Sequence, residues 1–334
     1  MRRPLAITAA VIALSAAPAG AREPLDFDLT RLGPPSAEVW LWQLPCQTPT
    51  GCNADQRADA AQMAGDARVR FARLATDLAL GLTTTLSQPA STTGYSGFQF
   101  DLEGSYTGVS HRPIGGTTLS FPEATYGGAR DYWPSRSQRP GELLVTSLHV
   151  RKGLPFSFEV GGRVSYLAQS SYFATQLEGK WALVEGYAYV PDVAVRAAWT
   201  RLLGHRELDL GATELGLLTS KRFGVNAVTS LTPYLALRYT RVSASTKTLA
   251  FRPVTGPTTP EEAAGSFAAF PNVKAGLYRT TGGVRLTSFA VALAAELTWY
   301  GGGTFGEETP AAADYPRYFV PSSFSGAFKF GFEF

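Results

Sequence analysis

Histidine is the side chain best suited to acid–base chemistry near neutral pH, and a catalytic histidine needs a nucleophile or a carboxylate within hydrogen-bond reach. Ser147 and Arg151 lie two positions before and after His149, and Asp209 lies four positions after His205. Neither spacing occurs a second time in the sequence, so we expect these histidines to be polar residues without a catalytic role. We predict no metal site and no cofactor. The three histidines are His111, His149 and His205.

A second set of polar groups consists of charged side chains that alternate with apolar residues. If one face of each strand lines an interior, these charges share it, with seven basic and four acidic members. Two interpretations remain open: a paired network that stabilises the wall, or a narrow path that weakly prefers anions. The set is Glu159, Arg163, Glu178, Lys180, Arg196, Arg238, Arg279, Arg285, Glu296, Lys329 and Glu333.

The elements that position these charges are strands, because the hydrophobic period is two from residue 98 to the end. The apolar positions of 156–169 and 289–300 alternate with polar ones over 10 to 15 residues. Strands of soluble proteins are usually about five or six residues long, whereas a tilted strand that spans a membrane needs about 9–11. We therefore predict that Trp181 and Trp199 face lipid and that Glu178 and Arg196 face a lumen.

Composition excludes several classes of protein. The chain is 17% charged and 12% aromatic, which argues against intrinsic disorder. Beyond the N-terminus no apolar run reaches the roughly 18 residues of a spanning helix. A formal net charge of +3 is too small and too dispersed to predict nucleic-acid binding.

The last strand has phenylalanines at every second position and ends in one: Phe328, Phe330, Phe332 and Phe334. On a soluble protein this edge would be an aggregation hazard. The ending resembles the C-terminal insertion signal of bacterial outer-membrane β-barrels. The resemblance implies a Gram-negative outer membrane, its lipid, and recognition by the barrel-assembly machinery.

The N-terminus reads as an export signal. Residues 1–21 combine a basic start, a short apolar stretch and Ala19-Gly20-Ala21, a pattern typical of a signal peptide. Residues 22–96 then form an N-terminal segment and 97–334 the barrel. Cys46 and Cys52 have five residues between them, so in an oxidising compartment we predict a local disulfide.

A helix is predicted at 54–82, within a segment that extends to residue 86. It is free of proline, and Asn53 or Asp55 can cap its start. An apolar stripe at spacings of three, four and four residues must be buried, so we expect a helix that plugs or caps the barrel, packs at its rim, or docks on another protein. The stripe is Phe71, Leu74, Leu78 and Leu82.

The number of strands follows when successive connections are assigned to opposite sides of the membrane, starting at the C-terminus and proceeding towards the N-terminus. This count gives ten strands. Long connections then fall outside and most short turns fall in the periplasm, as this class requires. The count places the N-terminal helix on the periplasmic side, and twelve strands result if 38–44 and 78–86 also join. The predicted fold class is an all-β, transmembrane, antiparallel up-and-down barrel with an N-terminal periplasmic or plug helix.

Two functions remain open. One is a narrow, porin-like channel or uptake protein for small solutes or lipophilic molecules, with the helix as plug or cap. The other is a non-conducting barrel that anchors an envelope complex or a surface interaction, with a periplasmic or envelope partner. The helix-then-barrel layout resembles the long-chain fatty-acid channel family, from which no residue can be carried over.

Enzymatic barrels are a third class. Outer-membrane phospholipases, omptin proteases and lipid A deacylases all rely on a histidine. The phospholipase pairing of a strand histidine with a serine two residues later is absent, because Arg151 follows His149. We therefore expect no enzymatic activity.

Overall fold

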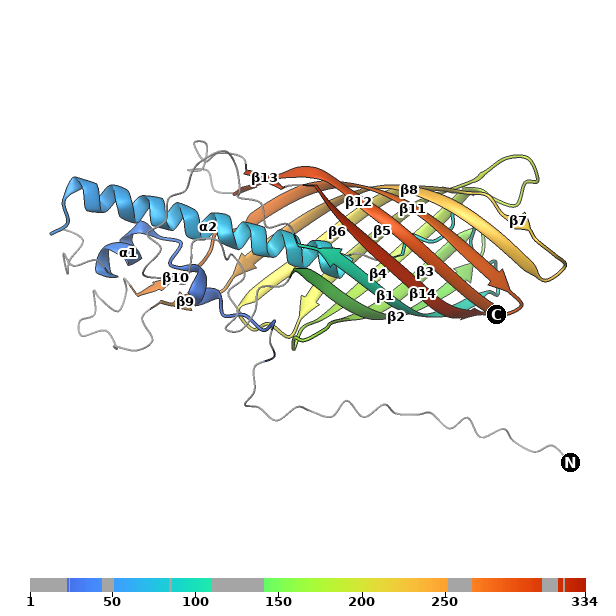
Figure 1. Cartoon of the computed structure of the whole chain (residues 1–334), viewed down its shortest axis with the longest axis horizontal. Coiled ribbons are helices and arrows are strands. Elements are labelled where there is room, and N and C mark those ends of the chain that lie inside the picture. Colours follow the sequence, from blue (N-terminus) through green and yellow to red (C-terminus); the bar gives the residue numbers. More distant parts are fainter. Residues whose placement is uncertain are drawn as a thin grey trace, which may run out of the picture.

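The computed structural model describes residues 23, 25–43, 51–83, 86–109, 141–251, 266–307, 318–320 and 322–334. The predicted signal peptide, Cys46 and His111 lie outside these ranges. The main body is a barrel of ten long strands (Figure 1). They are β1 (Phe98–Gly108), β2 (Glu142–Leu154), β3 (Phe158–Leu167), β4 (Phe173–Val184), β5 (Asp192–Leu203), β6 (Leu208–Ser220), β8 (Thr229–Thr246), β11 (Val273–Ser288), β12 (Val291–Glu307) and β14 (Ser323–Glu333).

Each long strand pairs antiparallel with the next one along the chain. The order is β1-β2-β3-β4-β5-β6-β8-β11-β12-β14, and β14 closes the barrel on β1, with Phe100 opposite Phe332. Short strands extend the connections: β7 (Phe223–Gly224), the pair β9 (Leu249–Ala250) and β10 (Phe267–Ala268), and β13 (Tyr318–Val320). The prediction of ten strands is confirmed. The twelve-strand alternative is wrong, because residues 37–43 and 54–83 are helical.

The barrel wall separates apolar from polar side chains as the alternation predicted. Leu177 is 62% exposed on the outer face, whereas Thr200 is 4% exposed on the inner face. Trp181 and Trp199 also lie outside. A continuous apolar outer face is the surface that a membrane-spanning barrel presents to lipid. The C-terminal phenylalanines share this face, and the backbone of Phe334 pairs with that of Phe98.

No helix among the described residues is long and apolar enough to cross a membrane.

The two ends of the barrel differ in their connections. One end carries the turns 155–157, 185–191, 221–228 and 289–290, together with the C-terminus. The other end carries the connections 109–141, 247–272 and 308–322 as well as two short ones. We call them the turn end and the loop end.

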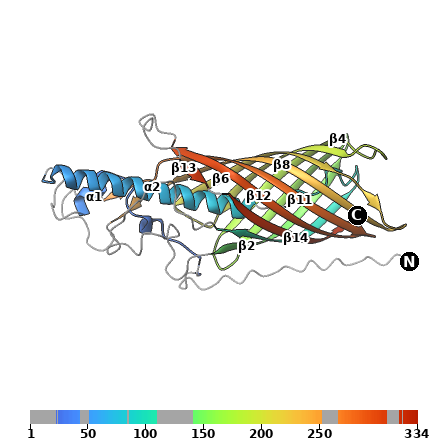
Figure 2. The same ribbon diagram turned by 45° about the horizontal axis from the view of Figure 1, so that its top comes forward.

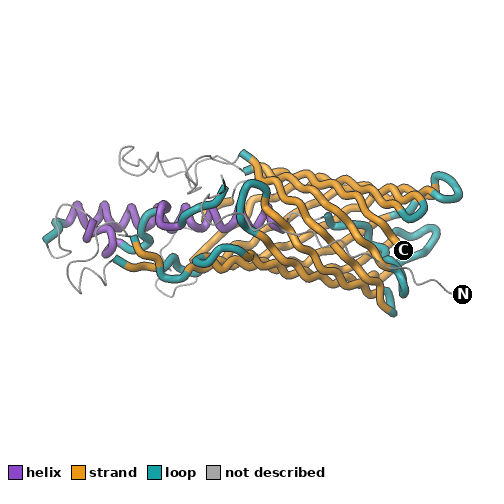
Figure 3. The backbone as a smooth tube through the Cα atoms, turned by 90° about the horizontal axis from the view of Figure 1, so that it is seen from below, coloured by secondary structure: helices purple, strands orange, loops and turns teal. Residues whose placement is uncertain are grey.

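Helix α2 (Ala54–Thr83) begins beyond the loop end and runs into the barrel (Figures 1 and 2). Asn53 and Gln56 form a reciprocal capping box, in which each side chain accepts a hydrogen bond from the other's backbone N–H at 2.8 and 2.9 Å. Two short elements, η1 (Leu29–Leu32) and α1 (Ala37–Gln43), precede it, and α1 packs on α2. The tube view from below shows the same entry into the strands (Figure 3).

The expectation that this helix lies at the end of the barrel where β1 starts is wrong. β1 does begin at the turn end, as the strand count required. The preceding chain, however, crosses the lumen, so the helix lies at the opposite end. The strand count constrains where β1 starts and leaves open the direction from which the chain arrives.

Candidate functional site in the barrel lumen

The loop-side part of the lumen is apolar and encloses the second half of α2. The stripe residues Phe71, Leu74, Leu78 and Leu82 are each 3% exposed or less. They form one cluster with inward apolar residues of the wall, and Phe71 stacks on Phe270 with ring centroids 4.6 Å apart. The wall members of the cluster include Leu143, Val145, Leu167, Leu202, Leu210, Val242 and Leu277. The helix is thus an internal plug that packs against the wall.

Glycine permits a close approach between the helix and the wall. A Cβ atom at Gly81 would lie 2.9 Å from Leu143 Cδ1. A larger residue would require Leu143 to shift or the helix to move away from β2.

The C-terminal end of α2 is capped by a buried guanidinium. Arg279 of β11 donates to the Thr83 carbonyl oxygen at 2.8 Å and also to its hydroxyl. A cation at this end satisfies a free carbonyl and complements the helix dipole. Arg279 lies 3.4 Å from Glu214 and over the ring of Tyr300. The apolar part of the lumen therefore ends at an ion pair.

Residues 86–97, which we call the tether, continue from the helix to β1. They contain no helix, so their backbone N–H groups need external acceptors. Ser87 and Gln88 donate to Glu296 Oε1 at 2.5 and 3.1 Å. Thr93 donates to Glu159 at 2.9 Å. Further side chains of the barrel bind the tether between these points: Ser220 accepts from Ala90, Glu185 from Thr92, and Lys180 donates to the carbonyls of Pro89 and Ser91.

Gln88 joins the tether to three strands. Its amide oxygen accepts from Arg151 of β2 and, at 2.5 Å, from Lys329 of β14. Its amide nitrogen donates to Asp101 of β1 at 3.2 Å. Lys329 is itself 3.2 Å from Asp101. This side chain is therefore enclosed by an ion-pair cluster.

All eleven predicted lumen charges face the interior of the barrel. Glu178 lies in contact with Arg196, Arg163 contacts Glu103, and Arg285 contacts Glu333 at the turn end. The predicted set omitted five further charged residues, four acidic and one basic, so the predicted excess of basic groups is wrong. Among the described strand residues the balance is eight basic to eight acidic. The omitted residues are Asp101, Glu103, Arg151, Asp192 and Glu214.

Glu214 is the centre of one subcluster. Arg196 lies 2.5 Å from it, and Arg238 and Arg279 lie 3.5 and 3.4 Å away. The three guanidinium groups surround a carboxylate that is 4% exposed, and Arg196 also contacts Glu178. Each of these arginines thus contacts a carboxylate, as buried charges require.

His149 is fully buried between two carboxylates. Its Nδ1 lies 3.0 Å from Glu103 and its Nε2 lies 2.9 Å from Glu178. Ligand atoms of Asp101, Glu103 and His149 also lie within 4.8 Å of one another, a spacing that could hold a metal ion. Arg163 already lies 3.0 Å from Glu103, and Lys329 lies 3.2 Å from Asp101, so both carboxylates of this group are neutralised. A divalent cation would have to displace both, so the donor set fits an ion-pair network better than a metal centre.

The first described residues fasten to the rim of the loop end. The N–H of Phe27 donates to the Tyr172 hydroxyl at 3.0 Å. The ring of Phe27 stacks on that of His205, with ring centroids 4.8 Å apart. Asp26 accepts from the backbone of Ser171 at 2.7 Å. Burial lowers the pKa of His205, and its Nδ1 accepts two backbone hydrogen bonds within its own turn. His205 is thus a packing residue of this clasp.

Two further features belong to the outer half of the N-terminal segment. Burial raises the pKa of Asp66 to about 6, against an opposing effect of Arg70. Cys52 is 5% exposed. The Cys46–Cys52 pairing stays a prediction, because Cys46 lies outside the described residues.

Comparison with known proteins finds low similarity to two solved outer-membrane proteins. No family model and no curated protein sequence matches this chain. The outer membrane protease OmpT from Escherichia coli is 8% identical, with coverage of 75% of this chain and 99% of OmpT and a TM-score of 0.28. The translocator domain of the autotransporter NalP from Neisseria meningitidis is 12% identical, with coverage of 81% and 97% and a TM-score of 0.28. At these values neither protein assigns a role to any residue here.

Proposed function

We propose that this protein is a closed, non-conducting β-barrel of a Gram-negative outer membrane that holds its own N-terminal segment at the cell surface. One observation carries the proposal: α2 enters from the loop end, and the chain leaves the lumen at the turn end to start β1. Short turns of such barrels face the periplasm and long loops face outward. With that orientation, η1, α1 and the first half of α2 lie outside the cell.

The filling of the lumen supports the non-conducting part of the proposal. The helix occupies the apolar part, the tether occupies the charged part, and the wall charges balance. Small barrels have interiors that side chains can fill, and a further polypeptide segment leaves still less room. The partner that this arrangement favours is extracellular, instead of the periplasmic partner that the sequence suggested.

The two histidines that the structure describes support a function other than catalysis. His149 has no exposed surface, and both of its ring nitrogens contact carboxylates. His205 is held between Phe27 and its own turn. We therefore propose a binding or display function, with outer-membrane lipid around the barrel and the assembly machinery recognising Phe334.

A channel that opens when the plug moves is the second candidate. It is favoured by the hydrogen bonds of 87–93 described above, which go to side chains of the barrel and could exchange without unpairing a strand. Such a channel would still have to separate the helix from its apolar wall. Conductance, considered at the end of the Discussion, distinguishes the two candidates.

Site-directed labelling tests the orientation. In a chain with Cys46→Ser and Cys52→Ser, we would introduce Ala58→Cys in the exposed start of α2 or Tyr189→Cys at the turn end. A membrane-impermeant maleimide should label Ala58→Cys on intact cells, and Tyr189→Cys only after lysis. Labelling of Tyr189→Cys alone on intact cells, or of neither, would contradict the proposal.

A further inference from the structure

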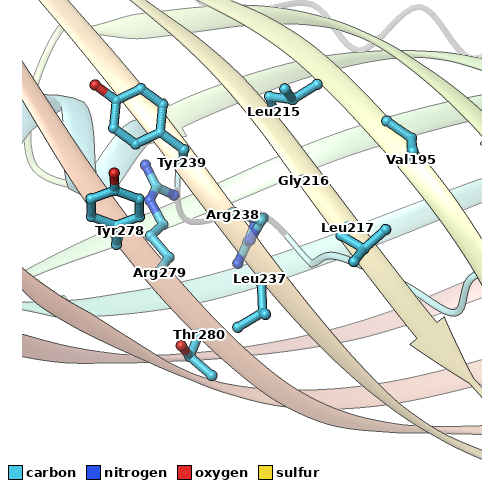
Figure 4. A pocket seen from close by; sticks show the side chains of 10 residues that line it. All are labelled: Val195, Leu215, Gly216, Leu217, Leu237, Arg238, Tyr239, Tyr278, Arg279 and Thr280. Carbon is cyan, nitrogen blue, oxygen red and sulfur yellow. The ribbon is translucent and has the colours of Figure 1, made fainter.

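A groove crosses the outer wall where β6, β8 and β11 lie side by side (Figure 4). Its volume is about 480 Å³. Leu215 is opposite Tyr239, and Tyr239 is opposite Tyr278 with ring centroids 5.0 Å apart. Leu217 and Leu237 form the next pair. Besides the inward residues Arg238 and Arg279, the lining consists mainly of side chains that face lipid, so the groove suits a hydrocarbon chain.

The two tyrosines mark the depth of the groove in the membrane. They belong to a set of outward aromatic residues in the middle or the loop-side half of eight strands, and aromatic girdles of this class of barrel lie at the membrane interface. The groove therefore starts at the headgroup level and continues towards the hydrocarbon. The set is Tyr106, Tyr166, Phe173, Trp199, Tyr239, Tyr278, Trp299 and Phe324.

Two basic residues lie just beyond the tyrosines. Arg241 is exposed and stands two positions after Tyr239 on β8. Lys274 of β11 has the same outward parity and is opposite Ser243, while Arg241 is opposite Gly276. The two cations are thus diagonal neighbours on one face, about 7–8 Å apart at the backbone. That spacing lets both side chains reach one phosphate group.

Gly276 leaves room for the side chain of Tyr239. A Cβ atom at Gly276 would lie 2.5 Å from the Tyr239 hydroxyl, so only glycine lets this hydroxyl pack over β11. Gly276 is also opposite Arg241. The Tyr239 hydroxyl and the Arg241 cation therefore lie at the same edge of the groove.

We propose that this patch binds a phosphorylated, acylated glycolipid of the outer leaflet, of the lipopolysaccharide type. A headgroup phosphate pairs with Arg241 and Lys274, and one acyl chain lies in the groove. Charged hydrogen bonds to phosphate are the strong ones, and arginine makes them bidentate. The assignment to the outer leaflet rests on the membrane orientation given in the proposed function. The contacts with a phosphate and an acyl chain do not depend on that orientation.

Binding to the purified full-length protein tests the proposal without depending on orientation or conductance. Native mass spectrometry in detergent would measure affinity for diphosphoryl lipid A, dephosphorylated lipid A and phosphatidylglycerol. We expect diphosphoryl lipid A to bind best. The double variant Arg241→Ala and Lys274→Ala should lower its affinity about tenfold or more.

Matched variants separate the two parts of the site. Leu215→Trp fills the groove and should also weaken binding, while Leu293→Trp, on the outer face of β12, should not. Arg222→Ala removes an exposed cation at the turn end and should leave affinity within about twofold. Equal binding by the wild type and the double variant would overturn the proposal. So would equal affinity for dephosphorylated lipid A or for phosphatidylglycerol.

Discussion

The two parts of the lumen are filled by different means. The loop-side part joins an apolar wall to a helix with an apolar stripe. The turn-side part joins a wall of sixteen charged side chains to a tether without regular secondary structure. The change occurs at Thr83, where Arg279 caps the helix.

This difference follows from the backbone that each part encloses. A helix satisfies its N–H and C=O groups internally, so its surroundings can be apolar. A tether leaves these groups free, and buried free groups need partners. Glu296 and Glu159 of the wall accept from Ser87, Gln88 and Thr93 for this reason. The chemistry of the wall thus matches the secondary structure inside it.

Removing the filling from both parts should have the largest effect. Deletion of 22–89 with the signal peptide kept leaves the charged wall exposed to water in an open lumen. We expect a permeable barrel, measured as uptake of small sugars by liposomes that contain it. Heat-modifiability of the variant checks that the barrel still forms, and a folded but impermeable variant would contradict the plug assignment.

Within the charged part of the lumen, substitution of Glu214 should lower the free energy of unfolding the most. Glu214→Ala leaves three arginines without their shared carboxylate, and breaking a buried pair typically costs about 3–5 kcal/mol. Unfolding in denaturant measures this loss. Glu142→Ala, an exposed carboxylate on β2, serves as the control. Similar small effects of both variants would refute the cluster.

The apolar part should respond to truncation of the stripe. Leu78→Ala removes a fully buried side chain and should cost about 2–5 kcal/mol. Leu177→Ala faces lipid and should cost less, because lipid fills the space that the side chain leaves. Unfolding free energies of the two variants decide the matter. If Leu177→Ala costs as much, the helix is not packed against the wall.

Loosening the tether should be distinguishable from loosening the helix. Glu296→Ala removes the acceptor of Ser87 and Gln88, which should cost about 1–3 kcal/mol. Hydrogen exchange should quicken at 87–88 while the amides of 71–82 stay protected. Faster exchange throughout α2 would mean that the two parts do not act separately.

The smallest effect concerns Asp66, where the helix leaves the barrel. Its pKa is raised from 3.8 to about 6, so the folded state binds the proton more tightly than the unfolded chain does. Stability should therefore fall as pH rises from about 4 to about 6. Asp66→Asn removes this loss and should stabilise the protein by about 1–2 kcal/mol at pH 7.5, and not at pH 4. Thermal unfolding at both values tests this, and an equal gain at pH 4 would refute the assignment.

The sequence predicted the charged part of the lumen better than the apolar part. Alternation reports a polar inner face, so residues such as Glu159 and Arg196 were placed correctly. β1 offered the same signal, because Asp101 and Glu103 alternate with Phe100 and Leu102. Those two carboxylates could therefore have been found from alternation alone.

Alternation fails where both faces of a strand are apolar. Leu143, Leu144 and Val145 follow one another on β2 because one face meets lipid and the other meets the helix. Glu214 stands on a strand of this kind and carried no period-two signal. Consecutive apolar residues near the loop ends of the strands therefore indicated, at the level of the sequence, that an apolar segment fills this part of the lumen.

Single-channel recording of the full-length protein in planar bilayers tests the closed barrel most directly. The helix, the tether and the balanced charges predict membranes that stay at baseline conductance after insertion is verified. The deletion of 22–89, recorded in the same way, should give stable open steps. Comparable open steps from the full-length protein would contradict the account.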